Sequence, residues 1–247
     1  MNELSVVRGG LVGYESASLA QKALANARRD GTVGDLLLLL EHPPVYTKGR
    51  RTTADELPMG EDWYRMQGFE IAETDRGGRL TYHGPGQIVG YPIVNLSELG
   101  LGVREFVERM ETAMIGALAE FEVSAGLIEG LTGVWVGNQP PPQGEARKIG
   151  SIGLHVRQSI TTHGLAINVN NDLQPFEWVT PCGIEACRMT SVAREQGAEQ
   201  DIDAFATALA AHLAAVYGLN PGELAADELA KLVPEASTFA SSVLTAT

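Results

Sequence analysis

The sequence predicts an α+β fold in which helices flank a mixed β-sheet. Strand-like stretches arrive in clusters instead of alternating strictly with helices, which argues against a doubly wound fold. The chain has 247 residues, 44% hydrophobic and 20% charged, which suits one soluble globular domain. We expect a single catalytic domain over residues 1–235 and a flexible tail, rich in Ser, Thr and Ala, over residues 236–247.

Four stretches have helical character. Residues 15–29 are rich in Ala and Leu and are stopped by Asp30-Gly31, and apolar side chains recur at helical spacing over 103–121. Residues 201–217 predict a long amphipathic helix, and residues 222–232 predict another.

Strands are predicted between these helices. Residues 36–40 form a continuous apolar run that ends before Pro43-Pro44, so we expect a strand covered on both faces. Shorter or more mixed stretches predict further strands at 4–7, 68–74, 87–95, 132–136, 149–156 and 166–169. The Pro-rich residues 137–144 predict an exposed surface loop.

Charge and composition exclude several classes of function. The formal net charge is −13, which argues against non-specific nucleic-acid binding because that needs a basic surface. We expect no membrane association, because no window approaches the apolar length of a membrane span, and no signal peptide. Two cysteines cannot form a disulfide framework, so we expect reduced thiols and a cytoplasmic location.

The densest cluster of Gly and polar residues is residues 76–87. Its glycines allow close approach to a ligand, and Arg76, Arg79, Tyr82, His83 and Gln87 offer directional hydrogen-bonding groups. The alternative is a Gly-rich turn with two solvated arginines. The segment lacks the Gly-Lys-Ser/Thr ending of a phosphate-binding loop.

Two further segments place one candidate side chain each beside a strand. Lys148 begins a strand of small and apolar residues, where desolvation would lower its pKa and make it a usable base; the alternative is a surface lysine. His163-Gly164 precedes another strand, and we expect His163 to be a hydrogen-bonded structural histidine; a catalytic histidine is the alternative.

The fourth segment holds the two cysteines. Cys182 lies between Pro181 and Gly183, a setting suited to an exposed, reacting thiol. Cys187 follows five residues later, and we expect it to be a packed, inert thiol. Their spacing is not a common zinc spacing, so no metal site is expected.

These four segments, in this order, resemble the octanoyl-(acyl-carrier-protein):protein N-octanoyltransferase family, also called lipoyl(octanoyl) transferases. The motifs are Arg-Gly-Gly-x-x-Thr-Tyr-His-Gly-Pro-Gly-Gln, Arg-Lys-Ile, His-Gly-Leu-Ala-x-Asn and Pro-Cys-Gly-Ile, and the resemblance runs from about residue 41 to 192. It implies the mixed-sheet fold of lipoate- and biotin-protein ligases.

The resemblance also implies a reaction and its residues. The family moves an octanoyl group from acyl carrier protein to a lysine of a lipoyl domain, in lipoate biosynthesis, without a cofactor or metal. By position, Cys182 matches the cysteine that carries the acyl group and Lys148 the lysine that activates it. The matching substrate-binding residues are Arg76, Gly77, Gly78, Arg79, Leu80, Thr81, Tyr82, His83, Ser151, Ile152, Gly153, Gly164, Leu165 and Ala166.

The implied partners are octanoyl-acyl carrier protein, lipoyl domains of 2-oxoacid dehydrogenase complexes and the glycine cleavage H protein, and we expect a monomer. The main alternative is an ATP-dependent lipoate- or biotin-type ligase of the same fold. A second alternative is a binding module that shuttles or senses acyl groups without catalysis.

Two expectations concern the shape and charge of the site. Small residues, namely Gly150, Ser151, Gly153, Gly164 and Ala166, are expected to line an apolar slot without filling it. Because residues 195–247 hold eight acids and one base, we expect an acidic far side. A basic docking rim is expected from Lys48, Arg50, Arg51, Arg76, Arg79, Arg147 and Lys148.

Overall fold

The computed structural model describes residues 3–180, 187–237 and 239. The helices are α1 Tyr14–Arg29, α2 Glu61–Met66, α3 Leu96–Leu99, α4 Val103–Glu120, α5 Gln174–Glu177, α6 Val192–Gln196, α7 Ile202–Tyr217 and α8 Ala226–Leu232. The strands are β1 Glu3–Leu11, β2 Asp35–Glu41, β3 Val45–Lys48, β4 Glu70–Glu73, β5 Thr81–His83, β6 Gln87–Ile93, β7 Ala125–Ile128, β8 Leu131–Val136, β9 Arg147–Arg157, β10 Ile160–Asn168, β11 Arg188–Met189 and β12 Asn220–Glu223.

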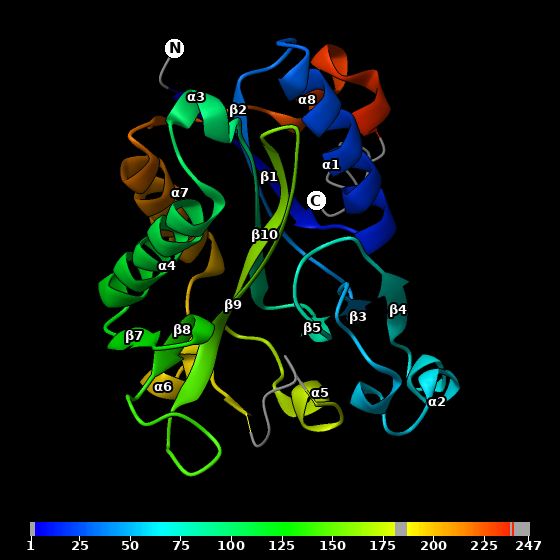
Figure 1. Ribbon diagram of the computed structural model, residues 1–247, viewed down its shortest axis with the longest axis vertical. Helices are drawn as coiled ribbons and strands as arrows, with labels where there is room; N and C mark the ends of the chain where they lie inside the picture. The colour runs from blue at the N-terminus through cyan, green and yellow to red at the C-terminus, as the bar shows by residue number, and fades with distance from the viewer. Residues whose placement is uncertain (1–2, 181–186, 238, 240–247) are drawn as a thin grey trace.

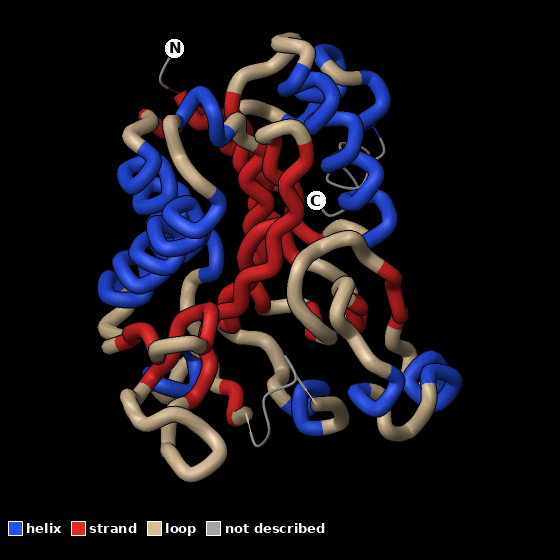
Figure 2. Tube along the Cα trace, in the orientation of Figure 1, coloured by secondary structure: helices blue, strands red, loops and turns tan. Residues whose placement is uncertain are grey.

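A mixed sheet forms the centre of the molecule, with strand order β12-β1-β2-β6-β10-β9-β8-β7 and β11 paired to β9 (Figures 1 and 2). β1 runs parallel to β12 and to β2, whereas β2, β6, β10 and β9 follow one another antiparallel. The predicted α+β fold, a mixed sheet flanked by helices, is therefore confirmed.

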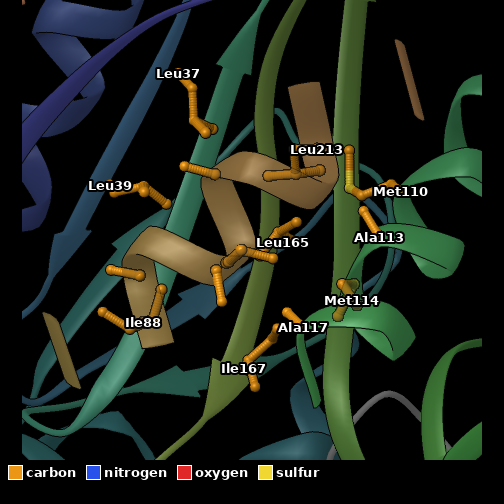
Figure 3. Packing of buried hydrophobic residues seen from close by; sticks show 14 of the residues in the cluster. Leu37, Leu39, Ile88, Met110, Ala113, Met114, Ala117, Leu165, Ile167 and Leu213 are labelled. Atoms are coloured by element: carbon orange, nitrogen blue, oxygen red, sulfur yellow. The ribbon is translucent and has the colours of Figure 1, made fainter. Parts of the chain in front are cut away.

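Helices cover both faces of this sheet. α4 and α7 lie on one side and α1 and α8 on the other (Figure 1). Under α4 and α7, a cluster that includes Leu37, Leu39 and Met114 is buried (Figure 3). Under α1 and α8, a second cluster contains Leu36, Leu38 and Leu40. Alternate leucines of β2 thus enter opposite cores, which explains why that strand is a continuous apolar run.

A small sheet, β4-β3-β5, lies beside the central one. An aromatic cluster forms its core. The ring centroid of Tyr46 lies 5.1 Å from that of Tyr64 and 5.5 Å from that of Tyr82. The Gly-rich residues 76–87 follow β4 of this small sheet, include β5, and end at Gln87, where β6 of the central sheet begins.

Several observed extents differ from the predicted ones, among them those of β10, α8 and the expected tail. β10 begins at Ile160, before the predicted strand, and the predicted helix over 222–232 begins only at Ala226, because residues 220–223 pair with β1. Ala236 and Phe239, which belong to the expected tail, are buried against α1; the last eight residues lie outside the described part of the chain. Within that part, no helix is long and apolar enough to cross a bilayer.

Candidate functional site

A cavity of about 210 Å³ opens between the central sheet, the start of α1 and the Gly-rich segment. Its wall contains most of the residues singled out from the sequence. The Gly-rich segment contributes Arg76, Gly78, Arg79, Thr81 and His83. The strands β9 and β10 contribute Lys148, Ser151, Ile152, Gly153, Gly164, Leu165 and Ala166.

Three expected substrate-binding residues do not line this cavity. Leu80 and Tyr82 are buried in the aromatic cluster of the small sheet, because alternate residues around β5 point to opposite faces and only Thr81 and His83 face the cavity. Gly77 instead docks the segment onto β9, since its N–H donates to the carbonyl of Leu154 at 2.8 Å.

Lys148 is buried, with 3% of its surface exposed. Its Nζ donates to the carbonyl of Thr132 at 3.0 Å and lies 5.2 Å from the ring centroid of Trp135, which pairs with it across β8 and β9. The interpretation as a surface lysine is therefore wrong, and Nζ of Lys148 is held at the cavity wall by a carbonyl and an aromatic face.

Polar contacts hold the Gly-rich segment against β3, β9 and β10. Arg76 donates to the carbonyl oxygen of Thr47 at 2.6 Å and to its hydroxyl at 2.8 Å. Asp75 contacts His155 Nδ1 and His163 Nε2, each at 2.8 Å. Gly153 allows the segment to come close, because a Cβ there would lie 3.0 Å from the carbonyl oxygen of Gly77. The segment is thus held by β3 on one side and by β9 and β10 on the other.

His163 both stabilises the fold and lines the cavity. Its backbone has φ of 56°, unusual for a residue in a strand, and its N–H donates to Gln21 Oε1 at 2.6 Å. Burial lowers the pKa of His163, and the bond with Asp75 opposes that shift. The predicted structural role is confirmed by these bonds, while its place on the wall was not foreseen.

Two tyrosines on the wall, Tyr14 and Tyr91, were not predicted from the sequence. Burial raises the pKa of Tyr14 to about 12, and its ring stacks parallel to His83 with centroids 6.4 Å apart. The hydroxyl oxygen of Tyr91 lies 2.8 Å from Nε2 of His42. Both come from segments without a recognisable motif, at the start of α1 and within β6, so nothing local indicates that they reach the cavity.

The small residues serve packing as well as the cavity. A Cβ at Gly150 would lie 2.3 Å from Met114 in the core, and one at Gly164 would lie 2.2 Å from the carbonyl oxygen of Gly90. Gly150 is absent from the cavity wall. The expectation that Gly150 lines the slot is therefore wrong, because it leaves room for α4 instead. Gly164 does line the cavity, as expected, and it also leaves room for β6.

Cys182 lies outside the described residues. On the near side of the gap, the N–H of Thr180 donates to the carbonyl of Glu56 at 3.2 Å. On the far side, Met189 pairs with Lys148, whose carbonyl accepts from the N–H of Thr190 at 2.9 Å. Cys187 is half-buried between two apolar clusters. Over the described residues, His, Cys, Asp and Glu nowhere form a group of three or more that could hold a metal.

The expected basic rim is wrong for most of its members. Lys48 pairs with Glu61 and Glu73, Arg79 pairs with Glu56 and Arg147 pairs with Glu195. Arg76 and Lys148 are buried. Arg50 and Arg51 are exposed, and no ion pair of the described residues involves them.

Three curated relatives of this chain are named octanoyltransferase. An octanoyltransferase from Roseiflexus sp. (strain RS-1) is 40% identical over 90% of each chain, and one from Mycobacterium tuberculosis is 41% identical over 90% of each. An octanoyltransferase from Myxococcus xanthus is 43% identical over 80% of this chain; the match spans about half (55%) of that protein.

Solved structures of similar fold include the bi-partite lipoate protein ligase of Thermoplasma acidophilum. It superposes with a TM-score of 0.72 at 17% identity and covers 99% of this chain and 93% of that one. Residues 14–214 match the sequence family described as the lipoyl protein ligase A/B catalytic domain. This match covers most of the chain, so the protein belongs to the lipoyl protein ligase A/B catalytic domain family.

Proposed function

We propose that this chain is an octanoyltransferase that moves an octanoyl group from acyl carrier protein to a lysine of a lipoyl domain. The observation that carries the proposal is the cavity, in which buried Lys148 shares a wall with apolar and small residues such as Ile152, Leu165 and Ala166. Relatives named octanoyltransferase, at 40–43% identity, support it.

Cys182 would carry the acyl group between donor and acceptor. A free thiol has a pKa of about 8.5 and is mostly protonated at neutral pH, so the cysteine needs activation. A Lys148 ammonium beside the thiol favours the thiolate, and a neutral Lys148 amine could take the proton. The thiolate attacks the donor thioester and releases the thiolate of the carrier protein, which takes up a proton from Lys148. The acceptor lysine, deprotonated by Lys148, then attacks the acyl group, which forms the amide and releases the Cys182 thiolate.

The octanoyl chain fits the apolar part of the wall. Burying about seven methylenes at ~0.8 kcal/mol each stabilises the bound chain by about 5 kcal/mol. Arg76, whose guanidinium is fixed by Thr47, borders the same space, as does His83. The reaction needs no metal or cofactor, because thioester exchange and aminolysis require only a nucleophile and a base.

The proposed partners are octanoyl-acyl carrier protein as donor and, as acceptors, the lipoyl domains of 2-oxoacid dehydrogenase complexes and the glycine cleavage H protein. We further propose that the enzyme works as a monomer in the cytoplasm. Size-exclusion chromatography with light scattering tests the monomer, and a dimer at micromolar concentration would contradict it.

Intact-mass measurement tests the proposed intermediate. Incubation with octanoyl-acyl carrier protein is expected to add one octanoyl group to the wild type and to Cys187→Ser, and none to Cys182→Ser. Adding a lipoyl domain without ATP should then discharge the label to the domain. Equal labelling of Cys182→Ser would contradict the intermediate, and transfer that requires ATP would favour a ligase.

A further inference from the structure

A chain of buried polar side chains links His83 on the cavity wall to the strand beside Lys148. His83 Nδ1 lies 2.6 Å from Gln87 Oε1, and Gln87 Nε2 donates to Asn168 Oδ1 at 2.8 Å. Asn168 Nδ2 donates to the carbonyl of Thr190 at 2.9 Å, and the Thr190 N–H donates to the carbonyl of Lys148 at 2.9 Å. His83, Gln87, Asn168 and Thr190 are all at most 7% exposed.

Two backbone carbonyls determine which way both amides point. A carbonyl oxygen can only accept, so the Gln87 amide must turn Nε2 toward the carbonyl of Tyr82, 3.3 Å away, and the Asn168 amide must turn Nδ2 toward Thr190. Gln87 Oε1 therefore faces His83. Because this oxygen is an acceptor, His83 Nδ1 must carry the hydrogen.

The imidazole of His83 is also neutral. Burial holds the pKa of His83 well below its ordinary value, and the charges of His42 and Arg76 lower it further, while the bond to Gln87 opposes the shift. A neutral ring with its hydrogen on Nδ1 has a lone pair on Nε2. No hydrogen bond from the described residues occupies Nε2, and His83 lines the cavity.

We infer that Gln87 and Asn168 are positioning residues that lock His83 in this tautomer, so that Nε2 presents the cavity with a hydrogen-bond acceptor for the attacking amine of the acceptor lysine. The inference rests on the proposed function. A thioester carbonyl offers only acceptor atoms, whereas the amine offers N–H donors, so a lone pair on Nε2 matches the amine.

The position along the strands agrees with this assignment. Gln87 pairs with Asn168 across β6 and β10, and the preceding residue Ile167 pairs with Gly150, two residues from Lys148. The chain of amides therefore lies at the Lys148 end of the cavity. His83 accepts a hydrogen bond from the amine but takes no proton, and the role of base stays with Lys148.

Two replacements of His83 separate the ring nitrogens. In His83→Asn the amide reaches the position of Nδ1 and can still bond Gln87, but no acceptor remains at the ε position. In His83→Gln the amide reaches the ε position instead. The rates of octanoyl-enzyme formation and of its discharge to a lipoyl domain are measured separately by intact mass. His212→Asn, on α7 against Glu120, is the matched control.

His83→Asn is expected to slow discharge on the order of tenfold more than formation, because orientation of the amine is lost. His83→Gln should restore part of the discharge rate. The reverse order would show that His83 acts only through its bond to Gln87 and would overturn the inference. Failure of the wild type to form any octanoyl-enzyme would instead refute the proposed function.

Nitrogen-15 spectra of labelled histidine test the tautomer without any activity. At pH 7 the wild type should show His83 with a protonated Nδ1 and an unprotonated Nε2. Gln87→Met, which removes the amide, should shift this pattern toward the Nε2–H form. A wild-type spectrum with the hydrogen on Nε2 would overturn the inference, even if the variants failed to fold.

Discussion

A glycine places the side chain of Lys148. Gly133 has φ of 110°, and a Cβ there would lie 2.5 Å from the carbonyl oxygen of Gly150 and 2.8 Å from Cε of Lys148. Its N–H donates to the buried carboxylate of Glu111 at 2.7 Å. Burial raises the pKa of Glu111. Only glycine satisfies both the backbone conformation and the close approach of the lysine.

Gly133→Ala should therefore displace Lys148 and strain β8. We expect a loss of about 1–3 kcal/mol in the free energy of unfolding, measured with urea, together with a reduced rate of Cys182 acylation. Gly126→Ala is the matched control, because open space surrounds a Cβ there, and it should change stability by less than about 0.5 kcal/mol. Equal effects of the two replacements would contradict the explanation.

Lys148→Ala tests the proposed base directly. We expect acylation to fall at least about a hundredfold while the fold is retained, because the thiol loses both a nearby positive charge and a proton acceptor. Single-turnover rates with octanoyl-acyl carrier protein measure this, and circular dichroism monitors folding. Lys231→Ala, on the exposed surface of α8, is the control. Near-normal turnover in Lys148→Ala would reject the role.

Residue types were easier to predict than residue surroundings. Lys148 and His83 stand in dense motifs, so the sequence indicated that they matter. Tyr14 lies more than sixty residues from that motif and meets His83 only because the fold brings the start of α1 to the same cavity. The bond from Gln87 to Asn168 joins residues 81 positions apart, which no local pattern can reveal.

At the scale of elements, an ion pair fastens β11 and α6 to β9. Glu195 accepts from Arg147 Nε and Nη2 at 3.0 and 2.9 Å, and the hydroxyl of Thr190 donates to the same carboxylate. Thr190 also bonds the backbone of Lys148. This pair therefore holds residues 188–195 against the strand that bears Lys148.

The stability from Glu195 should depend on pH. Burial alone would raise the pKa of Glu195, but hydrogen bonds from Arg147 and Thr190 hold this pKa below its ordinary value of 4.5. When folding lowers the pKa of a carboxylate, the carboxylate contributes its full stabilisation of the fold at pH values above its unfolded-state pKa. This contribution is lost as the pH falls through the folded-state pKa. Glu195→Gln should cost about 1–2 kcal/mol at pH 7. The difference from wild type should shrink below pH 4.5.

Urea unfolding of both proteins from pH 7 to pH 3 measures that difference. Glu199→Gln, also in the acidic C-terminal region, is a suitable control. A difference between Glu195→Gln and wild type that stayed constant down to pH 3 would contradict the ion pair as its source.

Long periodic elements were predictable and short ones were not. The helices α1, α4 and α7 and the strand β2 follow from apolar spacing within each segment. β12, with the sequence Asn-Pro-Gly-Glu, has no strand propensity of its own and exists because it pairs with β1 at the sheet edge. β5 was not foreseen either, and its alternation decides which of Leu80, Thr81 and Tyr82 face the cavity.

At the scale of the whole molecule, fewer basic residues than expected contribute an unpaired positive charge near the cavity. Summing charges along the chain ignores pairing between distant residues, and Lys48, Arg79 and Arg147 are each neutralised by such pairing. Glu195, counted with the acidic far side, contributes to one of these pairs. Arg50 and Arg51 remain as exposed positive charges next to the cavity, whose wall includes Arg51.

Charge reversal tests whether these two arginines receive an acidic carrier protein. We expect acyl carrier protein to be acidic, so an enzyme of net charge −13 would repel it unless local positive charges steer the association. Arg50→Glu/Arg51→Glu should therefore raise KM for octanoyl-acyl carrier protein several-fold at low salt. The effect should shrink as salt is added, because the screening length falls to about 8 Å at 0.15 M ionic strength and becomes shorter still at higher salt. Arg104→Glu, exposed on α4, is the control and should leave KM unchanged.

An unchanged KM in the double variant at low salt would show that the carrier protein docks elsewhere. A rise that persists in high salt would point instead to the place of Arg51 on the cavity wall, and Arg50→Glu alone separates these two outcomes.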